Sequence, residues 1–475
     1  MIRLALPTGD LRGPVGDLLD GAGLSVDDYR GGSRSYTTNG AHGVQMRVFR
    51  EKDIPIQIAL GNYDLGVCRL EWVEDLTQRY PTDAIVRLRD LEIGQRSLYV
   101  AAEATRSGDI RDWAQVAGVR IVSEYANIAE ALAMGLRLSN YRVFPVWGSA
   151  EAYPPEDADL ALIAAADELE VTRLGLAPLL RLLDSSVWLV ANRDSLATND
   201  LSALLGPLGV TPVAQAGRPS LALPLVPASE SRRPIERPTG HASVVRMALP
   251  NGHQQKHAVA ALEATGLGVD GYNAIECVAR PKSDTQGLEL KVIRPQDMPQ
   301  QVALGHFDLA ICGRDWLIDH LYRFPGSPVQ EVADLGLGRY SVAAVVSDDL
   351  AVASLDDAVG LWHREGRRTV RVASEYVNIA DHCARSHHLP RYKVIPIGGA
   401  SEGFVPEDAE MLIEGTETGA TLAANNLKAI DSLLESTACV IGRRGSIPAA
   451  RKPLLEHLFA LFQRAGSVAR QAGEA

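Results

Sequence analysis

The chain contains one long sequence twice, and this duplication limits the folds it can adopt more than any other feature. The matching blocks keep the same order in both copies, and only a small insertion separates two of them in the second copy. Each copy is a unit of roughly 200 residues, far longer than the repeat of a solenoid. The matching pairs are Ile2–Asp10 with Val245–His253, Val48–Trp72 with Val292–Trp316, Val119–Glu130 with Val370–Asp381, and Tyr141–Asp159 with Tyr392–Glu410.

A proline-rich segment separates the two copies. Proline lacks a backbone N–H and has a fixed φ, so this segment can form neither a helix nor a central strand. We expect an extended tether that lets the two units pack against one another as a pseudo-dimer. The predicted parts are a first unit (1–211), a linker (212–242) and a second unit (243–475).

Within each unit, strand-like runs alternate with helical patterns. The apolar run Val245–Pro250 is typical of a buried strand, and His257–Leu267 has helical spacing and a predicted C-cap at Gly266. Such alternation predicts an α/β fold with parallel or mixed sheets and helices on both faces. A second group opens at Val370–Tyr376, so we expect two subdomains per unit and a cleft between them.

Composition narrows the functional class. The net charge of −12 argues against nucleic acid as a partner, because that binding relies on clustered Lys and Arg. No apolar run approaches the roughly 20 residues of a membrane span, and the apolar part of the N-terminus is too short for a secretory signal. We expect a cytoplasmic protein. The five cysteines form no CxxC pair, which argues against a zinc site or a disulfide framework.

The segment Glu414–Thr421 (EGTETGAT) is a candidate anion site. It follows a predicted strand, precedes a predicted helix, and supplies two glycines and three threonine hydroxyls. Backbone N–H groups at such a strand–helix junction can bind a phosphate without lysine. The alternative interpretation is an ordinary turn with Thr421 as a helix cap.

The loop and its surroundings resemble the ATP phosphoribosyltransferase family, which catalyses the first step of histidine biosynthesis. Family-like motifs follow in family order through the second unit, whereas each motif alone would be weak evidence. The resemblance implies a cleft between two α/β domains, as in type II periplasmic binding proteins. The segments that carry it are Arg294–Leu317 (RPQDMPQQVALGHFDLAICGRDWL), VASEYVNIA, GGASEGFVPEDAEMLIEGTETGATL and the residues that follow, up to Arg444.

The resemblance implies a transfer reaction in which N1 of ATP attacks C1 of phosphoribosyl diphosphate. Pyrophosphate leaves, and Mg²⁺ neutralises part of its charge. For every site residue the alternative is an ion pair or hydrogen bond that only shapes the cleft. The residues implied are Glu414 and Arg314 as catalytic groups, and Glu417, Thr418, Gly419, Ala420, Thr421, Asp315, Tyr376, Asn378, Glu402 and Arg294 in substrate binding.

The second unit departs from the family pattern in two places. The family carries a basic segment after its first strand, where this chain has Asn251–His253. A positive contact to phosphates is either missing here or supplied by Lys256 or Arg12 nearby. Glu414 replaces an aspartate that would face the ribose hydroxyls, and the extra methylene can shift that contact by about 1 Å.

The first unit departs much further. The segment Arg69–Glu71 stands where the second unit has Gly313–Asp315, and Ala166–Glu170 (ADELE) stands in place of Glu417–Thr421. Three acidic residues without glycine would repel a phosphate. Short members of the family act as dimers, so we expect a fused dimer with one functional site. Arg50 either reaches the second unit's cleft or pairs with Glu51 or Asp53.

The segment after residue 451 has a helical stripe of leucines and Phe462, which can cover a core or another chain. We expect no third α/β module after it. Histidine feedback is then expected to require a separate subunit resembling histidyl-tRNA synthetase, or the first unit itself. Two other functions stay open: a non-catalytic sensor of a nucleotide or of histidine, and a solute-binding protein.

Overall fold

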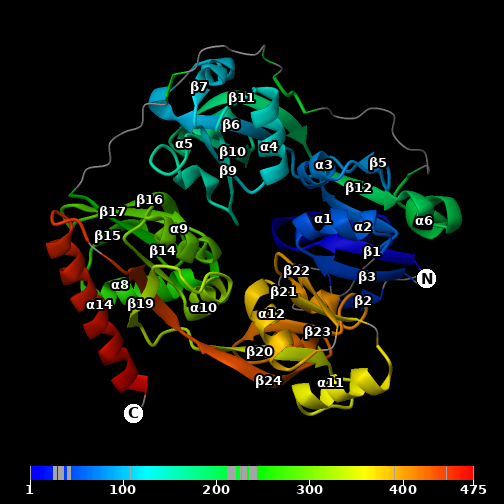
Figure 1. Ribbon diagram of the computed structural model, residues 1–475. Helices are drawn as coiled ribbons and strands as arrows, with labels where there is room; N and C mark the ends of the chain where they lie inside the picture. The colour runs from blue at the N-terminus through cyan, green and yellow to red at the C-terminus, as the bar shows by residue number, and fades with distance from the viewer. Residues whose placement is uncertain are drawn as a thin grey trace.

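Two mixed β-sheets form the framework of each unit, and the four sheets are arranged around a common centre (Figure 1). The structure is a computed structural model. The predicted α/β fold, with mixed sheets and two subdomains in each unit, is confirmed. The structure describes residues 2–24, 29, 37–39, 44–106, 108–210, 221–224, 226, 233–234, 243–367, 369–389, 391–445 and 447–473.

Subdomain I of the first unit contains the sheet β2-β3-β1-β4-β12-β5. Its strands are β1 (Ile2–Pro7), β2 (Thr37–Asn39), β3 (Val44–Phe49), β4 (Leu65–Arg69), β5 (Ile85–Asp90) and β12 (Val187–Asn192). Its helices are α1 (Arg12–Gly21), α2 (Ile54–Ala59), α3 (Leu70–Arg79), α6 (Arg193–Thr198) and α7 (Ser202–Leu205).

Subdomain II of the first unit contains the sheet β11-β6-β10-β8-β9. Its strands are β6 (Arg96–Glu103), β8 (Arg120–Ser123), β9 (Arg142–Pro145), β10 (Leu160–Ala165) and β11 (Leu176–Ser185). Its helices are α4 (Ala126–Gly135) and α5 (Glu168–Arg173). The chain crosses between the subdomains twice, from β5 to β6 and from β11 to β12.

The second unit repeats both sheets in the same order. Subdomain I has β17-β14-β18-β25-β19, and subdomain II has β22-β21-β23-β20-β24. The strands are β14 (Val245–Pro250), β17 (Leu288–Ile293), β18 (Leu309–Gly313), β19 (Val329–Asp334), β20 (Tyr340–Ser347), β21 (Val370–Ser374), β22 (Tyr392–Pro396), β23 (Met411–Thr416), β24 (Leu427–Ser436) and β25 (Ala438–Arg443). The helices are α8 (Gln255–Thr265), α9 (Met298–Leu304), α10 (Arg314–Arg323), α11 (Leu355–Arg364), α12 (Val377–Ser386), α13 (Ala420–Ala424) and α14 (Lys452–Gly473).

Local sequence explains several of these boundaries. Helix α8 ends where Gly266 adopts φ +73°, which confirms the predicted C-cap. A small hairpin of β15 (Val269–Tyr272) and β16 (Cys277–Ser283) follows it. In α14, Leu455, Leu458 and Phe462 are buried in the core of subdomain I of the second unit, so this helix covers the unit's own core.

The two units pack head to tail. Subdomain I of the first unit contacts subdomain II of the second, and the reverse pair makes an equivalent contact (Figure 1). At one contact Arg47 forms an ion pair with Glu407, and at the other Lys291 bonds to Glu156 at 2.9 Å. These residues are equivalent in the two copies, so the predicted intrachain pseudo-dimer is present.

The described part of the linker lies on the first unit rather than apart from it. Leu221, Leu223 and Val226 pack against its core, and the strand β13 (Arg233–Pro234) pairs with β7 (Val116–Ala117). Most of the predicted linker lies outside the described residues. All five cysteines are free. In the described part of the chain, no helix combines the length and apolar character that crossing a membrane requires.

Candidate active site

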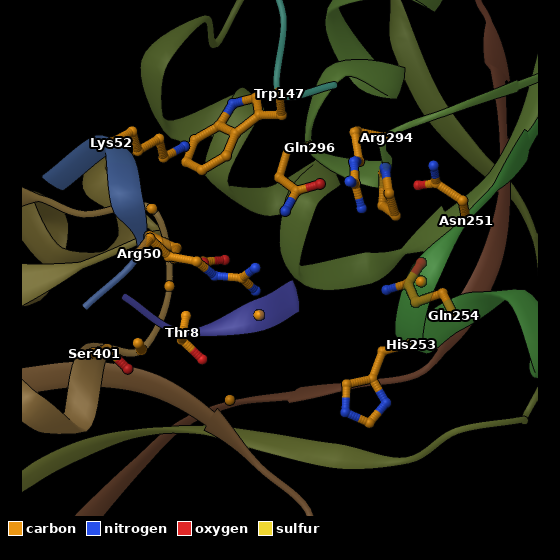
Figure 2. Close-up of a pocket in the computed structure, with 18 of the residues that line it drawn as sticks. Thr8, Arg50, Lys52, Trp147, Asn251, His253, Gln254, Arg294, Gln296 and Ser401 are labelled. Carbon is orange, nitrogen blue, oxygen red and sulfur yellow. The ribbon is translucent and has the colours of Figure 1, made fainter. Parts of the chain in front are cut away.

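A cavity of about 900 Å³ lies where the clefts of the two units meet. The carboxyl ends of β1, β3, β14 and β17 lead into its walls, as expected for ligand sites in α/β sheets. Figure 2 shows side chains of both units directed into this space, with Arg50 and Lys52 from the first unit and Asn251, Gln254 and Arg294 from the second. The two clefts therefore form one continuous site.

Most of the residues implicated by sequence reach this cavity. Nine line it: Glu414, Glu417, Thr418, Gly419, Ala420, Thr421, Tyr376, Glu402 and Arg294. Three are not among its lining residues: Arg314, Asp315 and Asn378.

The segment Glu414–Thr421, hereafter the phosphate loop, has the predicted strand–loop–helix form. Gly419 adopts φ +69°, a conformation that favours glycine, and its N–H donates to Thr416 Oγ1 at 3.1 Å. The following helix α13 has only five residues. Its dipole is correspondingly small, so a bound anion would depend mainly on the loop's own N–H groups and hydroxyls.

The first residue of this loop, Glu414, lies near two other carboxylates, those of Glu402 and Glu375. Burial and the neighbouring Glu402 and Glu375 raise the pKa of Glu414 well above its ordinary value. Burial likewise raises the pKa values of Glu402 and Glu375. Ser401 donates a hydrogen bond to the Glu414 carboxylate, which connects the Gly398–Glu402 segment to the phosphate loop. This group of acids favours a ligand that offers hydroxyl donors or carries a cation.

An aromatic wall completes the second unit's side. Trp316 and Tyr376 lie with ring centroids 4.4 Å apart, and Trp147 of the first unit lies 6.3 Å from Trp316. The Lys52 ammonium lies 3.8 Å from the centroid of the Trp147 ring (Figure 2). Trp147 occupies the position that corresponds to Gly398, so this contact breaks the symmetry of the two units.

The two equivalent arginines each reach the opposite unit. A Cβ atom placed on Gly399 would lie 2.7 Å from Arg50 Nε and 2.6 Å from Glu375 Oε1. A Cβ atom on Gly148 would lie 2.6 Å from Arg294 Nε. The second unit's loop at Gly399 therefore faces Arg50, and the first unit's loop at Gly148 faces Arg294. Arg294 also lies close to its own unit, because a Cβ atom on Gly252 would lie 3.7 Å from its Nη1.

Arg314 and Asp315 contribute to the wall behind the cavity. Arg314 donates to both oxygens of Glu331 at 2.8 Å and pairs with Asp334 at 3.0 Å. Asp315 is fully buried, accepts a hydrogen bond from Ser436 Oγ at 2.7 Å, and contacts Tyr340 and Tyr376. The neighbouring acids of β19 draw Arg314 away from the cavity.

Asn378 belongs to a structural contact between helices. Its amide donates to Asp319 Oδ2 at 2.6 Å, and its backbone N–H donates to Asp319 Oδ1 at 2.9 Å. The first unit contains the same arrangement, in which Asn127 donates to Asp75 at 2.7 Å and 3.0 Å. Because both units keep this contact, it serves the fold of each unit.

Paired charged side chains line the first unit's side of the cavity. Arg69 pairs with Asp10 and Glu51, both at 2.5 Å, and Arg96 Nε donates to Glu71 at 2.6 Å. Arg69 replaces Gly313 of the second unit. Ala166–Glu170, the counterpart of Glu417–Thr421, is not among the lining residues.

Sequence reasoning missed several lining residues. Glu375 directly precedes the predicted Tyr376, and Ser401 directly precedes Glu402, so both stood inside recognised motifs. Lys52 and Trp147 carried no local signal, because only the folded chain brings them to each other and to the second unit. Neither cation expected near the N-terminal segment lines the cavity: Arg12 donates to the Tyr29 carbonyl at 2.9 Å, and Lys256 is exposed.

A magnesium ion fits this site only with help from a substrate. In the described residues, no group of three His, Cys, Asp or Glu side chains is arranged to hold a metal alone. Mg²⁺ commonly binds through one or two carboxylates together with phosphate oxygens and water. Glu375 and Glu402 offer such carboxylates, and their raised pKa values show that a nearby positive charge would be favourable.

Comparisons with known proteins identify the family of this chain. The HisG family model, described as ATP phosphoribosyltransferase, matches residues 50–208 and 294–464. The ATP phosphoribosyltransferase of Chlorobium chlorochromatii (strain CaD3) is 32% identical over 208 residues, which cover 43% of this chain and 65% of that protein. The enzyme of Saccharolobus solfataricus is 31% identical over 206 residues, which cover 43% of this chain and 66% of that protein. This chain thus spans just under two thirds of the length of these curated relatives.

Among solved structures, an ATP phosphoribosyl transferase (HisG:HisZ) complex from Thermotoga maritima aligns with 47% of this chain and 99% of that chain. The sequence identity is 18% and the TM-score is 0.37. The family model matches both units and more than half of the chain. The chain therefore belongs to the HisG family of ATP phosphoribosyltransferases.

Proposed function

We propose that the chain is an ATP phosphoribosyltransferase with one functional site, in the second unit. The observation that carries this proposal is the phosphate loop, which lines the cavity in the second unit and is replaced by an acidic, glycine-free segment in the first. Family membership supports the reaction class.

The residues on the cavity wall have distinct roles in this proposal. The phosphate loop binds the 5′-phosphate of phosphoribosyl diphosphate, and Glu414 accepts hydrogen bonds from the ribose hydroxyls. Trp316 and Tyr376 orient the adenine. Arg50 places its guanidinium beside Gly399 and stabilises the negative charge of the diphosphate.

The chemical step joins the two substrates. The N1–C1 bond forms as the bond between C1 and the diphosphate oxygen breaks, and the electron pair leaves with pyrophosphate. Bound Mg²⁺, held by Glu375 and Glu402, would neutralise part of the charge on the leaving group. The protein contributes mainly by holding N1 close to C1 and in line with the bond that breaks.

The test is an assay of purified full-length chain with ATP, phosphoribosyl diphosphate and Mg²⁺, in which absorbance reports the adduct. Turnover that disappears when either substrate is omitted supports the proposal. Absence of turnover in folded protein, with and without a histidyl-tRNA-synthetase-like regulatory subunit, overturns it.

One observation favours a second candidate, a non-catalytic sensor of nucleotides or histidine. The N-terminal segment contributes Asn251, His253 and Gln254 to the cavity, while Arg12 and Lys256 lie elsewhere. Calorimetry separates the two functions: a sensor would bind ATP or histidine tightly and give no adduct.

A further inference from the structure

Asp53 lies at the boundary between the units, where its carboxylate is directed away from its own helix. It is the N-cap residue of α2, a position where an aspartate usually accepts a hydrogen bond from the helix's own first turn. No such bond is present at this cap. Instead Asp53 Oδ2 accepts the backbone N–H of Gly398, in the second unit, at 2.8 Å.

Gly398 begins a segment with an unusual backbone, Gly398–Glu402, hereafter the crossing loop. Gly399 has φ +114°, and Ala400 has φ +54° although it carries a side chain. A non-glycine residue in this region persists only when its surroundings hold it there. The loop then supplies Ser401, which donates to Glu414, and Glu402, which lines the cavity.

The crossing loop is also confined from the first unit by Lys52. A Cβ atom on Gly398 would lie 1.8 Å from Lys52 Cε, so the lysine side chain passes directly over this glycine. The hydrogen bond from Gly398 to Asp53 and the stem of Lys52 therefore meet the loop at the same residue. Both contacts come from the unit whose own phosphate loop has been lost.

The equivalent aspartate of the second unit, Asp297, makes the same kind of contact with the first unit. Asp297 Oδ2 accepts the backbone N–H of Trp147 at 2.9 Å. Asp297 belongs to the second unit, but the loop it contacts belongs to the first. The same hydrogen bond thus occurs twice, once at the loop that carries Ser401 and Glu402 and once at the loop that carries Trp147.

We propose that Asp53 is a positioning residue for the second unit's site, acting through Gly398 and Ser401 on Glu414. Asp297 makes the equivalent bond to a loop that carries Trp147 but no group bonded to Glu414. This inference rests on the proposed function, because it concerns the placement of groups in that site. It predicts that the aspartate in the degenerate unit matters more for activity than its counterpart in the functional unit.

The experiment compares Asp53→Ala with Asp297→Ala in the full-length chain. Each change leaves one backbone N–H without its partner, so both variants should lose a similar amount of stability. Asp53→Ala should lower kcat/KM for phosphoribosyl diphosphate by about 30-fold or more, since small displacements at a reacting centre have large effects. Asp297→Ala should lower it less, by about fivefold or below, because the loop that it releases carries Trp147 but no group bonded to Glu414. Asp53→Asn, which keeps an acceptor oxygen, should recover most of the activity.

Hydrogen exchange gives a readout that does not depend on turnover. Asp53→Ala should speed amide exchange in residues 397–404, and Asp297→Ala should speed it in residues 146–152. Equal losses of activity in the two alanine variants, or unchanged exchange in residues 397–404 of Asp53→Ala, would overturn the inference. If the unaltered chain shows no turnover, the proposed function fails, and the exchange measurement alone decides whether Asp53 positions the crossing loop.

Discussion

The two clefts share their framework and differ in their lining. Both have the same strand order, the same Asn–Asp contact between helices, and the same hydrogen bond across the unit boundary. Only the second has the phosphate loop and Gly313, whereas the first has Arg69 in place of that glycine, paired with Asp10 and Glu51 on the cavity wall. Parts that hold the pseudo-dimer together are therefore kept in both units, and parts suited to a phosphoribosyl ligand are kept in one.

The largest expected effect comes from giving the second unit the first unit's residue in the phosphate loop. Gly419→Glu places a carboxylate where the 5′-phosphate would bind and should lower kcat/KM for phosphoribosyl diphosphate by about 1,000-fold. No atom lies within 4 Å of a Cβ at Gly419, so the variant should fold despite the positive φ. Steady-state kinetics measures the loss.

The matched control is Glu168→Gly, the reverse exchange at the equivalent position of the first unit. Glu168 is exposed and absent from the cavity lining, so its replacement should change kcat/KM by no more than about twofold. A similar loss in both variants would contradict the asymmetry.

The next effect concerns the equivalent arginines. Arg50→Gln should lower kcat/KM by about 100-fold, because it removes the cation beside Gly399 in the second unit. Arg294→Gln should lower it less, by about tenfold or below, because that guanidinium lies mainly against Gly148 of the first unit. The two variants can be compared in one kinetic series, and the reverse order of effects would show that each arginine serves its own unit.

The contacts shared by both units should respond equally. Asn127→Ala and Asn378→Ala each leave a buried aspartate without its amide donor, and each should lower the free energy of unfolding by about 1–3 kcal/mol. Urea unfolding of the two variants measures this. A difference of more than about 1 kcal/mol would mean that one helix contact has diverged with the cleft.

The smallest effect concerns how the free energy of unfolding depends on pH at Asp53 and Asp297, the two aspartates that bond to the opposite unit. Burial raises the pKa of Asp297 to about 7, with Glu124 adding to the shift while Trp147 N–H, Lys52 and Arg294 oppose it. Burial likewise raises the pKa of Asp53 to about 6, against the opposing effects of Lys52, the Gly398 N–H and Arg50.

A raised pKa means that the folded state binds the proton more tightly than the unfolded state. The stability from each group is thus complete below its ordinary pKa of 3.8 and is lost as the pH rises through the folded value. Relative to the unaltered chain, Asp297→Asn should gain stability up to about pH 7, and Asp53→Asn only up to about pH 6. Urea unfolding between pH 5 and pH 8 tests this, and parallel curves would contradict it.

Sequence alone predicted the parts of the molecule that depend on local patterns. The strand Val245–Pro250, the C-cap at Gly266 and the strand–loop–helix form around Gly419 all follow from residues close together in the chain. These three features need no knowledge of distant contacts. The pseudo-dimer was predicted from the duplication of the whole unit.

The parts that could not be predicted depend on contacts across the chain. Arg314 lies beside Glu331 and Asp334 of β19, and a motif does not say which side of a helix faces a cavity. Asp53 and Gly398 are 345 positions apart, and only the head-to-tail packing of the units brings them together. The same packing directs Arg294 toward the first unit, although its motif belongs to the second.

The most direct test counts binding sites for phosphoribosyl diphosphate by isothermal titration calorimetry with Mg²⁺ present. The account predicts one site per chain, which Gly419→Glu abolishes and Glu168→Gly leaves intact. Two sites per chain, or one site that survives Gly419→Glu, would contradict the claim that a single phosphoribosyl site lies in the second unit.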